Sequence, residues 1–257
     1  LIAVYIRRPL ETTQGMRVPA IYVANPYMLE CNEDWYVPHD VDRDVSPYPQ
    51  QHITESEITF DPSTVSFPQP RYPRATVGYA DTAPTEEIPL DCISDWYSYF
   101  NSRGYASVFC GGLGTRGSQG FNCCGSPEET AAFKAVIDWL NGRCRAFTNL
   151  TDNIEIRADW CTGKVAMSGK SYLGTMCIAG ASTGVEGLET IIPEAAISNW
   201  YDYYRCNGLN LPAIGWQGDD LDILAKYCFS RAKDPEDYAS VREAYAAWLE
   251  GIAADED

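Results

Sequence analysis

The chain has 257 residues, 45% of them hydrophobic, and its 36 acidic and 19 basic residues give a formal net charge of -17 at pH 7. A chain of this size can bury a substantial core and is within the range of one large domain. The excess of negative charge argues against nucleic acid and anionic membranes as partners, because both bind proteins through Lys and Arg.

Two strands are predicted at the start of the chain, over residues 1–9 and 18–24, with a turn at 11–15 between them. The second strand is apolar enough to be central in a sheet. It ends in Asn25-Pro26-Tyr27, and in a parallel sheet the residues of a site collect at such strand ends. Tyr27 is therefore a candidate site residue, with a packed aromatic at a strand terminus as the alternative.

Residues 30–89 are rich in Pro, Asp, Tyr and Ser and have little periodicity. A structureless segment of that length is uncommon inside a compact domain, so we expect a functional segment, a surface excursion or a partly disordered stretch. A helix is then predicted over 95–102 and a strand over 105–110. The glycine-rich run at 111–120 lacks the spacing of nucleotide-binding motifs, so we interpret it as a loop with positive φ angles and close backbone approach.

The clearest helix signal begins at Ser126. Ser126 is predicted as the N-cap, Pro127 as the first helical residue, and Glu129 as the partner that completes a capping box. Apolar residues recur at helical spacing, and Gly142 ends the helix. The apolar residues predicted to face a sheet are Phe133, Val136, Ile137 and Leu140.

The chain is organised around residues 163–174, where an apolar run leads into Gly169-Lys170-Ser171 and small or apolar residues follow. This pattern indicates a buried strand, a tight turn and a packed helix. In the nucleophile elbow of α/β-hydrolases, glycine two residues before the serine allows such a turn, and the hydroxyl projects into a cleft. The pattern departs from G-x-S-x-G, because Leu173 comes two residues after the serine and Gly174 three. The alternative is an ordinary serine that caps the helix.

The alternation of strands and helices predicts an α/β fold with a mostly parallel sheet flanked by helices. A further buried strand is expected within residues 188–197. From residue 221 to the end the pattern is helical, which indicates the start of a lid or insertion.

Ten cysteines are present and none forms a C-x-x-C pair, while the two histidines, His39 and His52, lie in the Pro-rich segment. We therefore expect no metal site and no cofactor. Cys110, Cys177 and Cys228 lie in apolar stretches, where free thiols pack as small hydrophobic side chains. The sequence also has no signal-peptide pattern and no apolar run of membrane-spanning length. We expect reduced cysteines, a cytoplasmic location and no membrane association.

Five long stretches of the sequence carry a resemblance to a known family. They are GGLGTRGSQG at 111–120, AVIDWLNGRCR at 135–145, GKVAMSGKSYLGTM at 163–176, TGVEGLE at 183–189 and ISNWYDYYRCNGL at 197–209. They resemble the Xaa-Pro dipeptidyl-peptidases, serine peptidase family S15. This resemblance implies an α/β-hydrolase fold, a proline-specific aminopeptidase activity in proteolysis, and substrates with a free N-terminus and a penultimate proline.

The resemblance also implies roles for residues near the predicted elbow. Ser171 would be the acylating nucleophile, and its oxyanion hole would consist of the backbone N–H of Tyr172 and the phenol of Tyr27. This agrees with the residues themselves, because each donor aimed at a developing oxyanion stabilises the transition state by roughly 3 kcal/mol.

Substrate-binding residues are implied further along the chain. Trp200, Tyr203 and Tyr204 are similar to the apolar pocket that receives the penultimate proline, with core aromatics as the alternative. Asp219 stands where the family has a glutamate that anchors the substrate's ammonium group. A dipeptidyl-peptidase must recognise that amine, so a carboxylate is chemically required. Because Asp is shorter than Glu, Asp220 is the alternative anchor.

No histidine follows Ser171, although α/β-hydrolases order their triad as Ser, then Asp or Glu, then His. The resemblance places the triad Asp and His beyond this chain. We therefore expect residues 1–208 to be the front part of a catalytic domain and 209–257 the start of a helical lid. The alternatives are an S15-type esterase or acylase, or a non-catalytic truncated hydrolase-like protein. A homodimer of the full-length protein is left open.

Overall fold

The computed structural model describes residues 1–27, 74–82, 99–115, 117–120 and 124–205. The predicted lid segment 209–257 and both histidines lie outside these ranges. Within them, no helix is long and apolar enough to cross a membrane.

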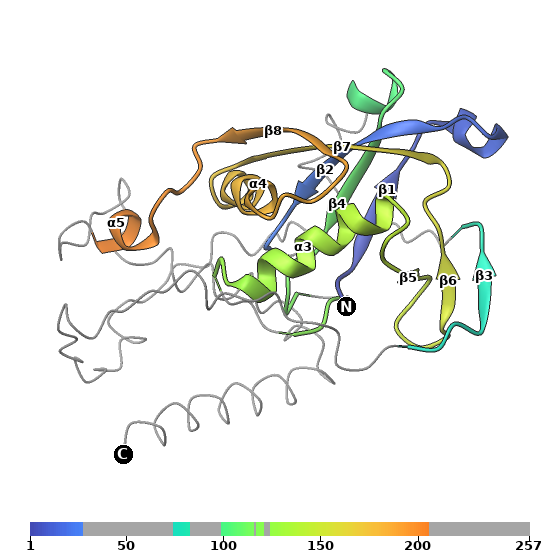
Figure 1. The fold of residues 1–257 in the computed structure, drawn as a ribbon, viewed down its shortest axis with the longest axis horizontal. Helices are drawn as coiled ribbons and strands as arrows, with labels where there is room; N and C mark the ends of the chain where they lie inside the picture. Colours follow the sequence, from blue (N-terminus) through green and yellow to red (C-terminus); the bar gives the residue numbers. More distant parts are fainter. Residues whose placement is uncertain (28–73, 83–98, 116, 121–123, 206–257) are drawn as a thin grey trace, which may run out of the picture.

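Five strands form the main sheet, in the order β1-β4-β2-β7-β8. The strands are β1 Val4–Arg7, β2 Val18–Ala24, β4 Ala106–Cys110, β7 Cys161–Lys170 and β8 Leu188–Glu194 (Figure 1). β1 is antiparallel to β4 and the other neighbours are parallel, which confirms the predicted mostly parallel sheet. β2 has its predicted bounds and central place, because all of its residues except Pro19 are buried.

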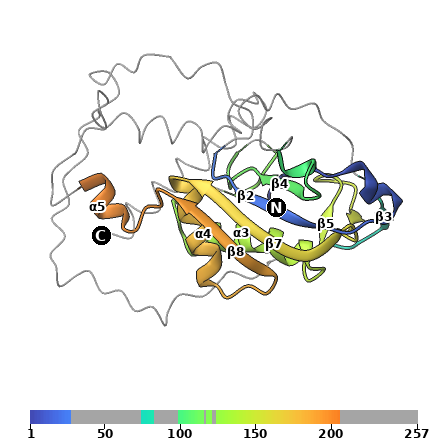
Figure 2. The ribbon, with the colours of Figure 1, turned by 90° about the horizontal axis from the view of Figure 1, so that it is seen from above.

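Two helices, α3 Pro127–Leu140 and α4 Tyr172–Ser182, cover one face of this sheet (Figure 1, Figure 2). Tyr22 of β2, Phe133 of α3 and Met176 of α4 belong to one buried core. The four apolar residues predicted to turn α3 toward the sheet are all buried. The helical period of the sequence therefore places α3 correctly.

Both ends of α3 follow their sequence signals. Ser126 is the N-cap, and its Oγ accepts a hydrogen bond from the Glu129 N–H at 3.2 Å. Pro127 is the first helical residue. Gly142 follows the C-cap residue with φ 74°. These local signals fix where α3 begins and ends, and so where the loop before it lies.

A second, three-stranded sheet has no counterpart among the predicted elements. Its order is β3-β6-β5, with β3 Gly78–Ala80, β5 Ala146–Phe147 and β6 Ile154–Ile156. β3 lies within the Pro-rich segment 30–89, where the sequence analysis expected no strand. Strands of two or three residues are too short to show an alternating pattern.

The prediction of a buried strand within 188–197 is half right. β8 forms, but most of its residues are exposed, and Ile192 is 55% exposed. Within the described part of the chain β8 is the edge of the sheet and pairs with β7 alone. Leu188 and Ile191 pack against the core, whereas the sequence analysis expected a buried strand in this segment.

Short helical segments complete the described structure. A 3-10 helix, η1 Leu10–Gln14, occupies the turn predicted between the first two strands. Residues 99–101 are helical and end the helix predicted over 95–102, whose first residues lie outside the described ranges. α5 Trp200–Arg205 lies beyond the carboxyl ends of the sheet strands (Figure 1, Figure 2).

The described cysteines are free thiols, and two of them lie in the core as predicted. Cys110 and Cys177 are both buried. Burial raises the pKa of the Cys110 thiol to about 12 and that of Cys177 to about 11. Because the thiolate is the reactive form, both side chains are protected by their pKa and by lack of access.

We therefore expect native protein at pH 8 to be alkylated by iodoacetamide at Cys124 and Cys144, which are exposed, and not at Cys110 or Cys177. Peptide mapping by mass spectrometry after a timed quench measures this difference. The same reaction in denaturant, where all four thiols are accessible, is the control. Native labelling of Cys110 as fast as that of Cys144 would contradict the burial of β4.

Candidate active site

The carboxyl ends of β2, β4 and β7 meet at one edge of the main sheet. Ala24 at the end of β2 lies beside Cys110 at the end of β4, and Tyr22 lies beside Met167 of β7. β2 is followed by Asn25-Pro26-Tyr27, β4 by the glycine-rich loop 111–120, and β7 by Ser171. Parallel pairing therefore brings together the segments that the sequence analysis singled out separately.

Ser171 forms the turn between β7 and α4 in a strained conformation. Its φ is 61° and its ψ is -121°, a region that residues with a side chain rarely adopt. Its N–H donates to the carbonyl of Glu194 on β8 at 2.9 Å, which fixes the turn against the edge strand. Ser171 occupies the N-cap position, yet its side chain makes no capping hydrogen bond. This geometry fits a nucleophile elbow and contradicts the alternative of a capping serine.

Two glycines allow the close contacts of this turn. A Cβ on Gly169 would lie 2.6 Å from the Leu173 Cβ, and a Cβ on Gly174 would lie 2.6 Å from the Glu194 carbonyl oxygen. The departure from the G-x-S-x-G spacing thus has a structural reason. At the third position after Ser171, the first turn of α4 passes against the backbone of β8, and only glycine fits there.

Tyr27 is held at the end of β2 by backbone contacts. Its N–H donates to the Asn25 Oδ1 at 3.0 Å, and its carbonyl accepts from the Gly112 N–H at 3.4 Å. The glycine-rich loop after β4 therefore packs directly against this strand end. The predicted positive φ angles in the loop are confirmed at Gly114, Gly117 and Gly120.

Four aromatic side chains at this edge pack against one another in series, and we call them the aromatic group: Tyr27, Tyr172, Trp200 and Tyr203. The distance between ring centroids is 5.8 Å for Tyr27 and Tyr172, 4.9 Å for Tyr172 and Trp200, and 6.5 Å for Trp200 and Tyr203. Each contact is edge to face, which is a favourable aromatic geometry. Tyr172 is buried, Tyr27 and Trp200 are partly buried, and Tyr203 is 49% exposed. The series runs from the core beside Ser171 out to solvent.

The loop before α3 closes against this group at Gly125. A Cβ on Gly125 would lie 2.8 Å from the Nε1 of Trp200, so the indole packs against bare backbone there. The Gly125 N–H donates to the Tyr172 Oη at 3.0 Å. Trp200 and Tyr172 are thereby positioned by the same residue, although they are 28 positions apart in the sequence.

Glu129 is the residue of this site that the sequence analysis missed. Its carboxylate is fully buried and accepts hydrogen bonds from the Tyr172 hydroxyl at 2.5 Å and from the Gly125 N–H at 2.6 Å. A capping box would instead direct this carboxylate to the N–H of the N-cap residue Ser126. The serine half of the predicted box is present, and the glutamate contacts the residue after Ser171. The capping pattern hid this role, because it accounts for a glutamate at that position without any other partner.

Some predicted site residues cannot be placed beside these. Asp219 and Asp220 lie outside the described residues, and so does the side chain of Tyr204. The structure thus brings together Ser171, Tyr172, Tyr27, Trp200 and Tyr203 and leaves the predicted ammonium anchors as predictions.

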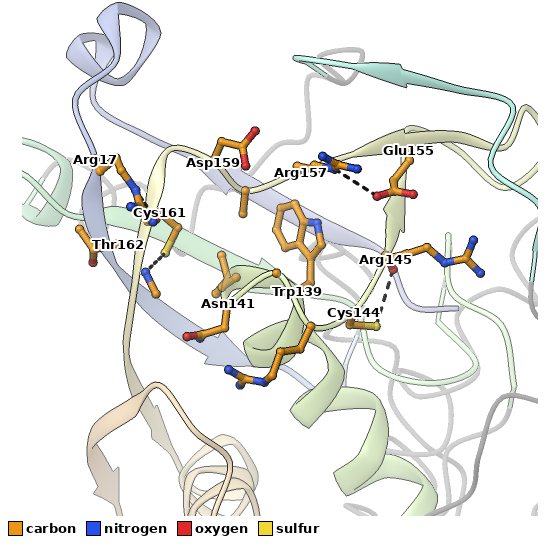
Figure 3. A pocket seen from close by; sticks show the side chains of 15 residues that line it. Arg17, Trp139, Asn141, Cys144, Arg145, Glu155, Arg157, Asp159, Cys161 and Thr162 are labelled. Carbon is orange, nitrogen blue, oxygen red and sulfur yellow. Dashed lines mark hydrogen bonds and ion pairs between the residues drawn. The ribbon is translucent and has the colours of Figure 1, made fainter.

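A hollow in the described residues lies elsewhere. It has a volume of about 720 Å³ and is lined by the end of α3 and the start of β7, with Arg17, Trp139 and Arg157 among its side chains (Figure 3). Ser171 follows the other end of β7, roughly 30 Å away at about 3.3 Å per strand residue. The strained serine and the aromatic group, and not this hollow, mark the candidate active site.

The fold and the elbow define the class: a mixed sheet with flanking helices and a strained serine between a parallel strand and a helix is consistent with an α/β-hydrolase-type fold. Residues 1–257 match the S15 peptidase family, described as X-Pro dipeptidyl-peptidase. The chain belongs to this family.

Individual relatives agree with this assignment. The Xaa-Pro dipeptidyl-peptidase of Pediococcus pentosaceus is 42% identical over 259 residues, which cover 100% of this chain and 31% of the relative. The Xaa-Pro dipeptidyl-peptidase of Lacticaseibacillus casei is 43% identical over 257 residues, which cover 100% of this chain and 32% of the relative. The chain thus spans about a third of the length of these curated relatives. A CocE/NonD family hydrolase from Staphylococcus aureus covers 78% of this chain and 26% of its own length at 16% identity and a TM-score of 0.44.

Proposed function

We propose that the full-length protein is a serine peptidase that releases N-terminal X-Pro dipeptides through an acyl-enzyme on Ser171. The observation that carries this proposal is the conformation of Ser171, with φ 61° and ψ -121° at the turn between β7 and α4. A strained turn of this kind is retained where surrounding packing enforces it, and such sites are commonly functional. Family membership supports the choice of peptide substrates with a penultimate proline.

The proposed chemistry begins with attack of the Ser171 Oγ on the carbonyl carbon of the substrate proline. The serine proton passes to a general base and then to the leaving amine, and water later hydrolyses the ester to release the dipeptide. The negative charge on the tetrahedral intermediate needs donors already in place. We assign these to the Tyr172 N–H, at the start of α4, and to the Tyr27 phenol, whose ring packs on Tyr172.

The proposed substrate pocket uses the outer members of the aromatic group. Trp200 and Tyr203 lie on α5 beyond the carboxyl edge of the sheet, and an apolar aromatic wall suits the flat proline ring. Tyr204 is proposed to complete this wall, and Asp219 or Asp220 to bind the substrate's free ammonium group. A charged amine buried at a fixed distance from the scissile bond needs such a carboxylate.

The general base and its acid partner are proposed to lie in the remainder of the protein. No histidine follows Ser171 in the sequence, and the chain covers 31% of the Pediococcus relative. The division into a catalytic front part, 1–208, and the start of a lid, 209–257, is proposed on the same grounds. A cytoplasmic location is proposed from the sequence pattern, and the homodimer stays a prediction.

Substrate selectivity tests this proposal. We expect the full-length protein to release p-nitroaniline from Ala-Pro-p-nitroanilide and not from its N-acetylated form, because acetylation removes the positive charge that the anchor binds. Both substrates present the same scissile bond, so the acetylated one is the matched control. Equal cleavage of the two would favour an S15-type esterase or acylase, and no cleavage together with an unlabelled Ser171 would favour a non-catalytic protein.

A further inference from the structure

We propose that Glu129 is a positioning residue for the proposed reaction, holding Tyr172 and through it the oxyanion donor and the aromatic wall. This inference rests on the proposed function, because it assigns a part to a residue of the same site. Glu129 does not contact the substrate in this proposal. It acts through the Tyr172 hydroxyl and the Gly125 N–H, the two donors that its carboxylate accepts.

The contacts form a closed network around one carboxylate oxygen. The Tyr172 hydroxyl and the Gly125 N–H both donate to the Glu129 Oε2, at 2.5 and 2.6 Å, and the Gly125 N–H also approaches the Tyr172 Oη at 3.0 Å. A separation of 2.5 Å is typical of a hydroxyl bonded to a carboxylate, and such bonds are about twice as strong as neutral ones. The network therefore fixes the far end of the Tyr172 ring.

Glu129 is well suited to hold this position. It lies in the first turn of α3, where the helix dipole favours a negative charge, and its own N–H is bonded to the Ser126 Oγ. Its side chain is fully buried, so removing the carboxylate would leave the Tyr172 hydroxyl and the Gly125 N–H without this acceptor. A buried carboxylate is retained only where it is well hydrogen-bonded.

Tyr172 transmits the constraint to both parts of the proposed site. It is the first residue of α4, and its backbone N–H adjoins Ser171. Its ring contacts Tyr27 on one side and Trp200 on the other. A shift of the ring would therefore move the oxyanion donors and the pocket wall together, and a displacement of about 1 Å can cost about a hundredfold in rate.

The test compares variants of the full-length protein with Ala-Pro-p-nitroanilide and with a fluorophosphonate that reacts with Ser171. Tyr172→Phe removes the hydroxyl and keeps the ring, and Glu129→Ala removes the acceptor. We expect each to lower kcat and the fluorophosphonate rate by roughly 10- to 100-fold, and to raise KM as well, because the pocket wall moves with the donors. We expect Glu129→Gln to keep at least a third of the wild-type kcat, because its Oε1 can accept both hydrogen bonds. We also expect the double variant Glu129→Ala/Tyr172→Phe to be no worse than the poorer single variant.

Glu128→Gln is the matched control, since Glu128 is exposed in the same turn of α3, and we expect wild-type kinetics from it. Rates are normalised to the amount of folded protein, measured by circular dichroism. If Glu129→Ala does not fold, the two single variants Tyr172→Phe and Glu129→Gln decide between the outcomes. Wild-type kcat per folded molecule in Tyr172→Phe would overturn the inference while the proposed function stands. A wild-type protein that neither cleaves the substrate nor reacts with the fluorophosphonate would overturn both the proposed function and the inference about Glu129.

Discussion

Replacing Ser171 by alanine is expected to abolish peptide cleavage, with a loss in kcat on the order of 10⁴-fold or more. The reason is that the proposed acyl bond forms to the Ser171 Oγ, which alanine lacks. Any residual rate would come from the proposed donors and pocket, which stay in place because the Ser171 N–H still bonds to Glu194 of β8 and fixes the turn. Release of p-nitroaniline from Ala-Pro-p-nitroanilide measures the loss, and the reaction with a fluorophosphonate should disappear in parallel.

Ser182→Ala is the control for this substitution. Ser182 is exposed at the far end of the same helix, and its Oγ donates only a local hydrogen bond to the Ala179 carbonyl at 2.7 Å. We expect wild-type cleavage and labelling from this variant. Retained cleavage in Ser171→Ala, with Ser182→Ala unchanged, would show that another residue carries the chemistry.

The sequence predicts well where local signals and burial agree. β2 is apolar along its whole length and is central in the sheet, and α3 begins at Ser126 and ends before Gly142 as its capping residues indicate. The elbow is predicted for the same reason. A tight turn from strand to helix requires glycine, serine and a run of small residues at nearby positions. The elbow can therefore be recognised from the sequence without the tertiary fold.

The predictions fail where a residue's environment is set by distant parts of the chain. β8 was expected to be buried, yet Ile192 is 55% exposed, because β7 is the one neighbour of β8 in the described sheet. Glu129 fits a capping box, and its actual partner Tyr172 lies 43 residues away. A local motif thus gave a sufficient account of the glutamate, and only the packing of α3 against α4 reveals its second contact.

Gly174→Ala is expected to destabilise the protein by about 3 kcal/mol and to slow the reaction of Ser171 with a fluorophosphonate. The added Cβ would lie 2.6 Å from the Glu194 carbonyl oxygen and 2.8 Å from the Gly169 carbonyl oxygen. Both are backbone atoms of the sheet, so relief requires α4 to move away from β7 and β8. The same movement would draw the start of α4, and the Tyr172 N–H with it, away from Ser171.

Gly180→Ala separates this effect from a general intolerance of alanine in α4. At Gly180 the nearest atom to an added Cβ is the Sδ of Met167 at 2.9 Å, the end of a flexible side chain that can shift. Alanine also favours a helix over glycine by about 1 kcal/mol, so we expect an unfolding midpoint close to that of the wild type. Thermal unfolding of the two variants in parallel measures the difference. If Gly174→Ala were as stable and as reactive as Gly180→Ala, the close contact between α4 and β8 would not be the reason that glycine is required three residues after the serine.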